Sequence, residues 1–202
     1  MTLWRGKHPL ILASQSRARQ TLLANAGINF EAVPAELDER ALQQASGLSA
    51  PGDVAALLAR EKALGVSSHQ PGRFVVGADQ TLALGSRLFS KPASPTQAAE
   101  QLRALSGRSH ELYSAVAVAR DGKILFAETT IARMTMLRLG ETEIGAYLGQ
   151  AGEAVTSSVG AYQLEGLGIH LFERIEGDHF TILGLPLLPL LAFLRSERLL
   201  NV

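Results

Sequence analysis

Asp79 has the clearest chemical setting of any acidic residue in the sequence. It follows the apolar residues 74–76 and two small residues, Gly77 and Ala78. This pattern predicts a buried strand over residues 73–78, which places the carboxylate where the strand ends. Open α/β sheets bind ligands in the crevice outside such strand ends, and small neighbours let a ligand or metal approach the backbone. A strand-terminating aspartate that starts a turn is the simpler alternative.

A second group of polar residues occupies positions 13–19, where a predicted strand leads into a helix. Ser14, Ser16, Arg17 and Arg19 bring two hydroxyl and two guanidinium groups to the helix N-terminus. Free backbone N–H groups, the helix dipole and positive charge together favour an anion. The segment matches neither a P-loop nor GxGxxG. An N-capped surface helix with solvated arginines explains it equally well.

Two lysines could neutralise phosphate oxygens. Lys62 belongs to a charged stretch, Arg60-Glu61-Lys62, on a predicted helix, where alternating charges are usually solvated. Lys91 follows a predicted strand and precedes Pro92, which restricts its backbone. Each lysine taken singly is more typical of a surface than of a site.

Asp79 and the pair Asp38-Glu39 are the acid candidates. Two separated carboxylates that face bound phosphates would suit magnesium, which prefers oxygen ligands. The metal would bridge phosphate oxygens, and one carboxylate could orient or deprotonate water. An exposed acidic loop over residues 36–40 is the alternative.

Composition excludes several classes of function. The 202 residues include 19 Lys and Arg, 19 Asp and Glu and no cysteine. Zero net charge argues against binding to nucleic acid or an anionic membrane, and the lack of cysteine excludes thiolate chemistry. The five histidines show no metal-ligand spacing. The most apolar segment, residues 180–194, is shorter than a membrane span and contains two prolines. We therefore expect a cytoplasmic protein with no nucleic-acid or membrane partner.

Helices and strands alternate early in the chain and hairpins dominate later, which predicts a mixed sheet. The first predicted helix covers residues 17–26, with Ser14 or Ser16 as its cap. Others begin after Ser94 and Gly140 and at Pro51 and Pro186. The helix from Pro51 is expected to end near Gly65. Predicted strands and hairpins cover residues 9–13, 30–33, 73–78, 82–84 with 87–89, 113–119 with 123–127, and 169–175 with 179–183.

These segments, in this order, resemble the Maf family of nucleoside triphosphate pyrophosphatases, once linked to septum formation. The resemblance covers nearly the whole chain, from residue 10 to about residue 195. The motifs that carry it are individually weak but specific as a collinear set. They are Leu12-Ala13-Ser14-Gln15-Ser16, Arg60-Glu61-Lys62-Ala63, Gly77-Ala78-Asp79-Gln80, Lys91-Pro92, Leu102-Arg103-Ala104-Leu105-Ser106-Gly107, Gly160-Ala161-Tyr162, Glu165-Gly166-Leu167-Gly168 and Gly184-Leu185-Pro186-Leu187.

The resemblance implies a single Maf-like domain over residues 1–202, with an elongated mixed β-sheet flanked by helices and two lobes around a central cleft. This architecture is also that of inosine triphosphate pyrophosphatases. The implied reaction cleaves the α–β phosphate bond of a nucleoside triphosphate. The products are a nucleoside monophosphate and pyrophosphate. The family also implies a divalent cation, Mg²⁺ or Mn²⁺, and a homodimer.

The resemblance also assigns roles to single residues. Asp79 is the expected proton acceptor, and Asp79 and Glu39 are the expected metal ligands. The expected phosphate-binding residues are Ser14, Arg19, Lys62 and Lys91.

Three positions distinguish branches of the family, and they correspond to Ala18, Gln80 and Glu165. Gln80 and Glu165 are similar to the branch that acts on 7-methyl-GTP, whereas Ala18 departs from both branches. Ser157 and Ser158 stand where the family usually has Asp and Lys. This departure keeps an alternative open, a non-catalytic nucleotide-binding regulator of cell division.

Overall fold

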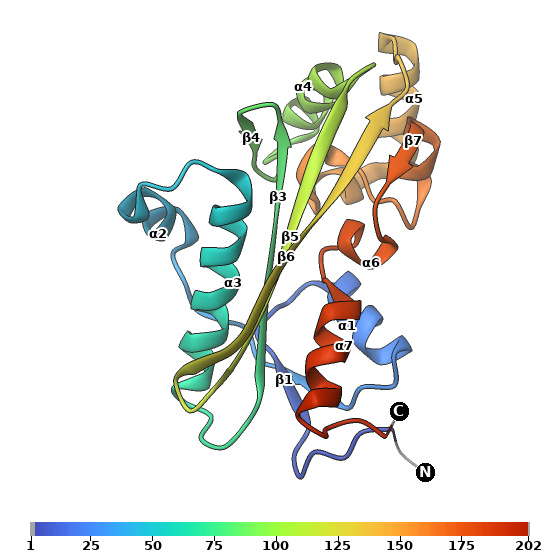
Figure 1. Ribbon diagram of the computed structural model, residues 1–202. Helices are drawn as coiled ribbons and strands as arrows, with labels where there is room; N and C mark the ends of the chain where they lie inside the picture. The colour runs from blue at the N-terminus through green and yellow to red at the C-terminus, as the bar shows by residue number, and fades with distance from the viewer. Residues whose placement is uncertain (1–2, 202) are drawn as a thin grey trace. The chain divides into compact units, whose positions relative to one another are not determined.

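The computed structural model describes residues 3–201, which form a mixed α/β fold (Figure 1). The strands are β1 (Leu10–Leu12), β2 (Phe30–Ala32), β3 (Val75–Leu84), β4 (Arg87–Phe89), β5 (Ser109–Arg120), β6 (Lys123–Met136) and β7 (Phe172–Glu176). The helices are α1 (Arg17–Asn25), α2 (Glu39–Ser46), α3 (Pro51–Ser67), α4 (Pro95–Leu105), α5 (Glu141–Ala151), α6 (His179–Ile182) and α7 (Leu187–Ser196), with the 3-10 helices η1 (Gly152–Thr156), η2 (Val159–Ala161) and η3 (Leu167–Leu171).

The strands form one sheet in the order β2-β1-β3-β5-β6-β7, and β4 pairs with β3. β1 is parallel to β2 and β3, whereas the β3–β4 and β6–β7 pairs are antiparallel. The expected mixed sheet flanked by helices is therefore confirmed. No helix within residues 3–201 is both long and apolar enough to cross a membrane.

The described chain divides into two compact units. The first unit contains the described residues up to Gln80, Ser114–Thr130, and the described residues from His179 onward. The second unit contains Thr81–Tyr113 and Ile131–Asp178. The expectation of one domain with two lobes around a cleft stays a prediction.

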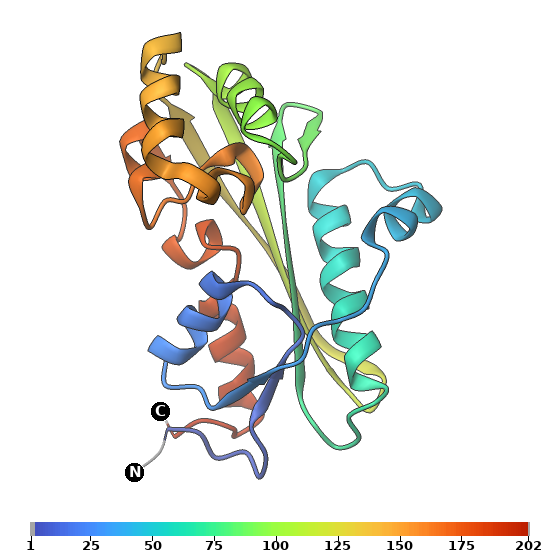
Figure 2. The same ribbon diagram turned by 180° about the vertical axis from the view of Figure 1, so that it is seen from behind.

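Side chains in the first unit alternate between the two faces of β3. Val75 packs with Val66 of α3 on one face. Val76 packs with leucines of α1 and α7 on the other. Figures 1 and 2 show these layers, with α3 on one side of the strands and α1 and α7 on the opposite side. Because strand side chains alternate with a period of two, Asp79 and Gln80 face different layers.

The expected helix starts and the first long hairpin are confirmed. The Ser16 and Ser94 hydroxyls cap α1 and α4 by accepting a hydrogen bond from the backbone N–H three residues on. Asp121 and Gly122 both have positive φ, 50° and 71°, as a tight turn between β5 and β6 requires.

The expected end of the third strand at residue 78 is wrong. β3 continues to Leu84, so Asp79 lies within the strand. The neighbouring strand β1 ends at Leu12, which pairs with Val76, and β3 then continues with β4 and β5 as partners. Asp79 thus lies beyond the carboxyl end of β1, in the region where α/β sheets bind ligands, although its own strand does not stop there.

The expected hairpin of residues 169–175 with 179–183 is also wrong. β7 pairs with β6, and α6 follows where a second strand was expected. The backbone N–H of Leu183 donates to the carbonyl oxygen of His179, and that of Gly184 donates to Thr181, so this short segment satisfies its own polar groups in a helical turn. The helix expected to end near Gly65 instead continues to Ser67, which lets Val66 pack on the sheet.

Candidate active site

Gly77 allows α3 to pack directly on β3. A Cβ atom at this position would overlap the carbonyl oxygen of Ala59 and lie 2.6 Å from the backbone nitrogen of Ala63. The space that we expected a ligand or metal to use is therefore filled by helix backbone. This close approach brings Lys62, the neighbour of Ala63, to Asp79, which shares a face of β3 with Gly77.

Lys62 links two carboxylates. Its Nζ lies 2.6 Å from Oδ1 of Asp79 and 2.8 Å from Oε1 of Glu39. The Lys62 and Asp79 side chains are only 12% and 11% exposed, whereas Glu39 is 50% exposed. Lys62 is therefore part of a buried cluster, while its neighbour Arg60 is exposed. The interpretation of the whole 60–62 stretch as a solvated face is wrong for Lys62.

Glu39 is held in place by an unexpected helix. It is the first residue of α2, and the Asp38 carboxylate caps this helix by accepting a hydrogen bond of 3.0 Å from the backbone N–H of Ala41. The two acidic neighbours thus have separate tasks, since Asp38 starts the helix and Glu39 contacts Lys62. An Asp before a helical turn is a common capping signal, which could have revealed α2 in the sequence.

Burial raises the pKa of the Asp79 carboxyl above its usual value, while the positive charges of Lys62 and Arg19 act in the opposite direction. Its Oδ1 accepts the hydrogen bond from Lys62. Within residues 3–201, no hydrogen bond reaches its Oδ2. Asp79 thus combines a raised proton affinity with an oxygen that is available to a ligand or water.

Three oxygen atoms of the first unit fix Arg19. Its Nε donates to the carbonyl oxygen of Gly184 at 2.7 Å, and its Nη1 donates to the Ala78 carbonyl at 2.8 Å and to Oγ of Ser14 at 3.2 Å. Burial lowers the pKa of the guanidinium, although the Asp79 and Glu39 charges oppose this. An arginine pKa starts so high that the group remains a cation.

The Nη2 group of Arg19 has no hydrogen-bond acceptor within the described part of the chain. Since a guanidinium carries five N–H donors, the anchored edge leaves Nη2 to bind an anion. Sequence reasoning identified Arg19 and Ser14 but missed the carbonyl groups of Ala78 and Gly184. The motif Gly184-Leu185-Pro186 was the only signal for the latter, and it gave no indication of an arginine contact.

Ser14 and Ala18 lie at the start of α1. The Ser14 hydroxyl is buried and accepts hydrogen bonds from the backbone N–H of Ser16 and from Arg19, both at 3.2 Å. Ala18 lies in the first helical turn and is partly exposed. The predicted anion site at this helix start therefore contains an anchored guanidinium, whereas Arg17 makes no comparable contact among the described residues.

Gln80 lies on the face of β3 opposite to Asp79. Its Nε2 donates to the hydroxyl of Ser114 at 2.8 Å and to the carbonyl groups of Thr181 and Ile182 at 3.0 and 3.1 Å. The amide donors of Gln80 thus bind other parts of the first unit. Its expected contact with substrate stays a prediction.

Lys91 and Glu165 belong to the second unit, and both are exposed. Lys91 follows β4, and Glu165 lies between η2 and η3. The other predicted site residues belong to the first unit, namely Ser14, Ala18, Arg19, Glu39, Lys62, Asp79 and Gln80. The structure directly joins Ser14 with Arg19, and Lys62 with both Asp79 and Glu39.

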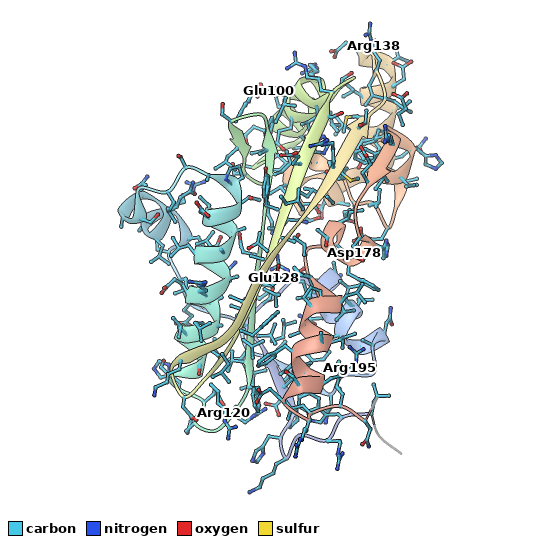
Figure 3. All side chains as sticks on the ribbon, in the orientation of Figure 1. Glu100, Arg120, Glu128, Arg138, Asp178 and Arg195 are labelled. Atoms are coloured by element: carbon cyan, nitrogen blue, oxygen red, sulfur yellow. The ribbon has the colours of Figure 1, made fainter. Side chains whose placement is uncertain are left out.

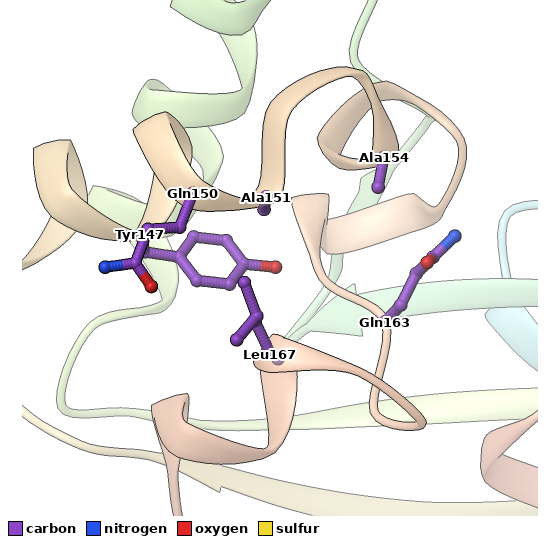
Figure 4. Close-up of a pocket in the computed structure, with 7 residues that line it drawn as sticks. Tyr147, Gln150, Ala151, Ala154, Gln163 and Leu167 are labelled. Carbon is purple, nitrogen blue, oxygen red and sulfur yellow. The ribbon is translucent and has the colours of Figure 1, made fainter.

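The second unit contains a small pocket between α5, η1 and the segment that leads into η3 (Figure 4). Its volume is about 150 Å³, and its lining residues are Tyr147, Gln150, Ala151, Ala154, Gln163, Leu167 and Gly168. None of the predicted site residues lines it.

The buried cluster around Asp79 differs from several other charged side chains of its unit. Arg120, Glu128 and Arg195, labelled in Figure 3, are exposed to solvent. Burying a charge is unfavourable unless partners compensate for lost hydration. Lys62 and Arg19 supply this compensation for Asp79, and the half-exposed Glu39 completes the cluster of charged groups beyond the end of β1.

The donor set also suits a divalent cation. Asp79 and Glu39 present carboxylates on either side of Lys62, and Mg²⁺ commonly uses one or two carboxylates together with substrate phosphates. No group of three or more metal-binding side chains occurs within residues 3–201. A metal at Asp79 and Glu39 would thus share its coordination with ligand oxygens and water.

The fold and the candidate site together define an α/β protein with a cluster of buried charged groups beyond the carboxyl end of β1. The chain belongs to the Maf family, since the family model described as "Maf-like protein" matches residues 9–197.

Curated relatives align over all or nearly all of the chain. The chain is 69% identical to the "Nucleoside triphosphate pyrophosphatase" of Bradyrhizobium diazoefficiens and 68% identical to the protein of the same name in Rhodopseudomonas palustris, with 100% of each chain covered. It is 52% identical to the "7-methyl-GTP pyrophosphatase" of Brucella abortus, over 95% of this chain and 98% of that protein.

Among solved structures, a HAM1 protein from Coxiella burnetii matches with a TM-score of 0.43 and 17% identity, over 65% of this chain and 74% of that chain. A score this low indicates only partial similarity of the backbones.

Proposed function

We propose that this protein hydrolyses a nucleoside triphosphate between its α- and β-phosphates, giving a nucleoside monophosphate and pyrophosphate. The observation that carries this proposal is the buried Asp79, which lies beside the Lys62 ammonium and within the field of Arg19. The full-length relatives named nucleoside triphosphate pyrophosphatase support the same reaction.

Water attacks the α-phosphorus, and Asp79 accepts its proton through Oδ2. Before a cation binds, the raised pKa of Asp79 makes it a stronger base than an ordinary aspartate. The new P–O bond forms as the bond to the β-phosphate oxygen breaks, and pyrophosphate leaves with the electron pair. Lys62 and Nη2 of Arg19 stabilise the negative charge of the phosphate chain. No covalent enzyme intermediate is needed.

We propose Asp79 and Glu39 as the protein ligands of Mg²⁺ or Mn²⁺. A bound divalent cation would neutralise phosphate charge and polarise the phosphoryl oxygens. Lys62 bridges both carboxylates, so it also keeps them close together before substrate arrives. We propose Lys91 as a further phosphate-binding cation, because its exposed ammonium follows β4 at a proline-restricted position.

The base preference remains a proposal. We propose 7-methyl-GTP as a substrate, with Ala18, Gln80 and Glu165 as residues that influence the choice of base. The name of the Brucella abortus relative supports this substrate. We also propose a cytoplasmic homodimer.

A panel of nucleoside triphosphates tests the reaction directly. Purified protein with Mg²⁺ or Mn²⁺ is incubated with the common triphosphates and 7-methyl-GTP, and released pyrophosphate and orthophosphate are measured separately. We expect pyrophosphate from at least one nucleotide, and at least about 100-fold slower release from the Asp79→Asn variant. Asp53→Asn is the matched control, since Asp53 is an exposed aspartate in the first turn of α3.

Nucleotide binding by calorimetry without any turnover would instead support the regulator of cell division. Release of orthophosphate in place of pyrophosphate would contradict cleavage of the α–β bond.

A further inference from the structure

The carbonyl oxygen of Thr181, at the end of α6, accepts three hydrogen bonds. The Ser114 hydroxyl of β5 donates at 2.6 Å, and Nε2 of Gln80 in β3 donates at 3.0 Å. The third donor is the backbone N–H of Gly184, also at 3.0 Å. Ser114 is fully buried. Two strands of the sheet thus hold the turn that ends in Gly184.

This turn is in direct contact with Arg19. The Gly184 carbonyl accepts the 2.7 Å hydrogen bond from Nε of Arg19, so its direction helps to set the plane of the guanidinium. Gly184 has a φ of +88°, and a Cβ there would lie 3.4 Å from Nη2 of Arg19. The free Nη2 edge therefore depends on the conformation of the turn.

We propose that Ser114 and Gln80 are positioning residues for Arg19. They fix the turn from Thr181 to Gly184, and this turn orients the guanidinium so that Nη2 faces the phosphate chain. The role of Gln80 follows from its place on the strand, since it faces α6 while Asp79 faces α3. The kinetic consequence rests on the proposed pyrophosphatase function, whereas the orientation of Arg19 does not.

Ser114→Ala tests this role with a matched control. Ser67→Ala also removes a buried serine hydroxyl of the first unit, one that accepts a hydrogen bond of 3.1 Å from the backbone N–H of Gly122. We expect Ser114→Ala to lower kcat/KM about tenfold, because small displacements of a positioned group are costly in catalysis. Ser67→Ala should leave kcat/KM unchanged. Equal losses in the two variants would overturn the proposal.

A double-mutant cycle separates positioning from general loss of structure. If Ser114 acts through Arg19, Ser114→Ala should cause little further loss of kcat/KM in an Arg19→Lys background. The same fold-loss in both backgrounds would show that Ser114 acts independently of Arg19.

Nuclear magnetic resonance can monitor the orientation of Arg19 and does not depend on substrate turnover. The Nε–H signal, assigned by its loss in Arg19→Lys, should shift and exchange faster with water in Ser114→Ala, but not in Ser67→Ala. An unchanged signal in Ser114→Ala would refute the positioning role. A shifted signal in a protein that releases no pyrophosphate would uphold the positioning role while the proposed function fails.

Discussion

The first unit buries charges around Asp79, whereas the second unit buries a neutral pair, His110 and Tyr162. In the second unit, Nε2 of His110 and Oη of Tyr162 form a hydrogen bond of 2.7 Å, with the two rings 5.7 Å apart. Burial lowers the pKa of His110 to about 4 and raises the pKa of Tyr162, so both groups are uncharged at neutral pH.

The difference lies in what each cluster leaves unpaired. In the first unit, Oδ2 of Asp79 is a hydrogen-bond acceptor on a carboxylate, and Nη2 of Arg19 is a hydrogen-bond donor on a guanidinium. Both atoms can bind a ligand. Among the buried polar side-chain atoms of residues 3–201, Nδ1 of His110 in the second unit is the one without a partner. Buried charge costs stability, whereas a neutral buried pair fixes the position of the chain at lower cost.

The largest effect is expected from Asp79→Asn. Loss of the general base should reduce kcat about 100- to 10,000-fold. The folded-state pKa of Asp79 is raised, so the stability linked to this group is present at low pH and lost as the pH rises through that pKa. The proton linkage of this group alone therefore predicts no loss of stability at pH 7 when Asn replaces it, although Lys62 then keeps only the half-exposed Glu39 as a partner. Steady-state kinetics and thermal unfolding of the same preparation check both statements.

A melting temperature of Asp79→Asn well below that of the wild type would contradict the statement that the buried charges of the first unit cost stability. It would show that the Asp79 charge supports the fold and is not a burden on it.

His110→Gln should change acid stability without changing the chemistry. The unfolded chain binds a proton at His110 below pH 6.5, but the folded protein does so only near pH 4, so stability falls as the pH falls through this window. The difference between the two pKa values corresponds to a loss of about 3 kcal/mol in the free energy of unfolding near pH 4. Urea unfolding between pH 7 and 4 should show that the free energy of unfolding falls less steeply with decreasing pH in the variant than in the wild type. Identical slopes for both proteins would mean that His110 is not held neutral.

Gly77→Ala should damage the site through the fold. The added methyl group meets the backbone of α3, and overpacking of this kind costs about 1–3 kcal/mol. Because the helix must shift, Lys62 should move away from Asp79 and kcat/KM should fall as well. Gly65→Ala on the same helix is the control, since its Cβ would have no neighbour closer than 3.8 Å. A stable, fully active Gly77→Ala would disprove the close approach.

The smallest effect is expected from Arg103→Ala in the second unit. Arg103 and Glu141 form two hydrogen bonds of 2.7 Å, but their side chains are 46% and 71% exposed. Exposed ion pairs contribute little to stability. The melting temperature should stay close to that of the wild type, which a single thermal scan can check. A large decrease would show that charge pairing matters outside the buried cluster.

Local signals in the sequence were sufficient to predict many helices and strands. Serine caps located α1 and α4, and Asp121-Gly122 located a hairpin, because these residues act on their own backbone. The strand through Asp79 was cut short because its continuation depends on partner strands. α6 was misassigned because four residues carry too little periodicity to distinguish a helix from a strand.

The candidate site could be predicted only in part, because several of its contacts join residues far apart in the sequence. The residue types around Asp79 suggested phosphate chemistry, and the family resemblance selected Arg19 and Lys62 among many cations. The contact between Arg19 and Gly184 joins residues 165 positions apart in the sequence. The role of Gly77 in helix packing also depends on tertiary structure, which no local pattern encodes.

Hydrolysis in ¹⁸O-labelled water tests the central claim most directly. The wild-type protein is supplied with the nucleotide that it turns over fastest, and both products are analysed by mass spectrometry. Attack by an Asp79-activated water on the α-phosphorus predicts the label in the nucleoside monophosphate and none in pyrophosphate, at a rate that collapses in Asp79→Asn. Label in pyrophosphate, or an undiminished rate in the variant, would contradict the account.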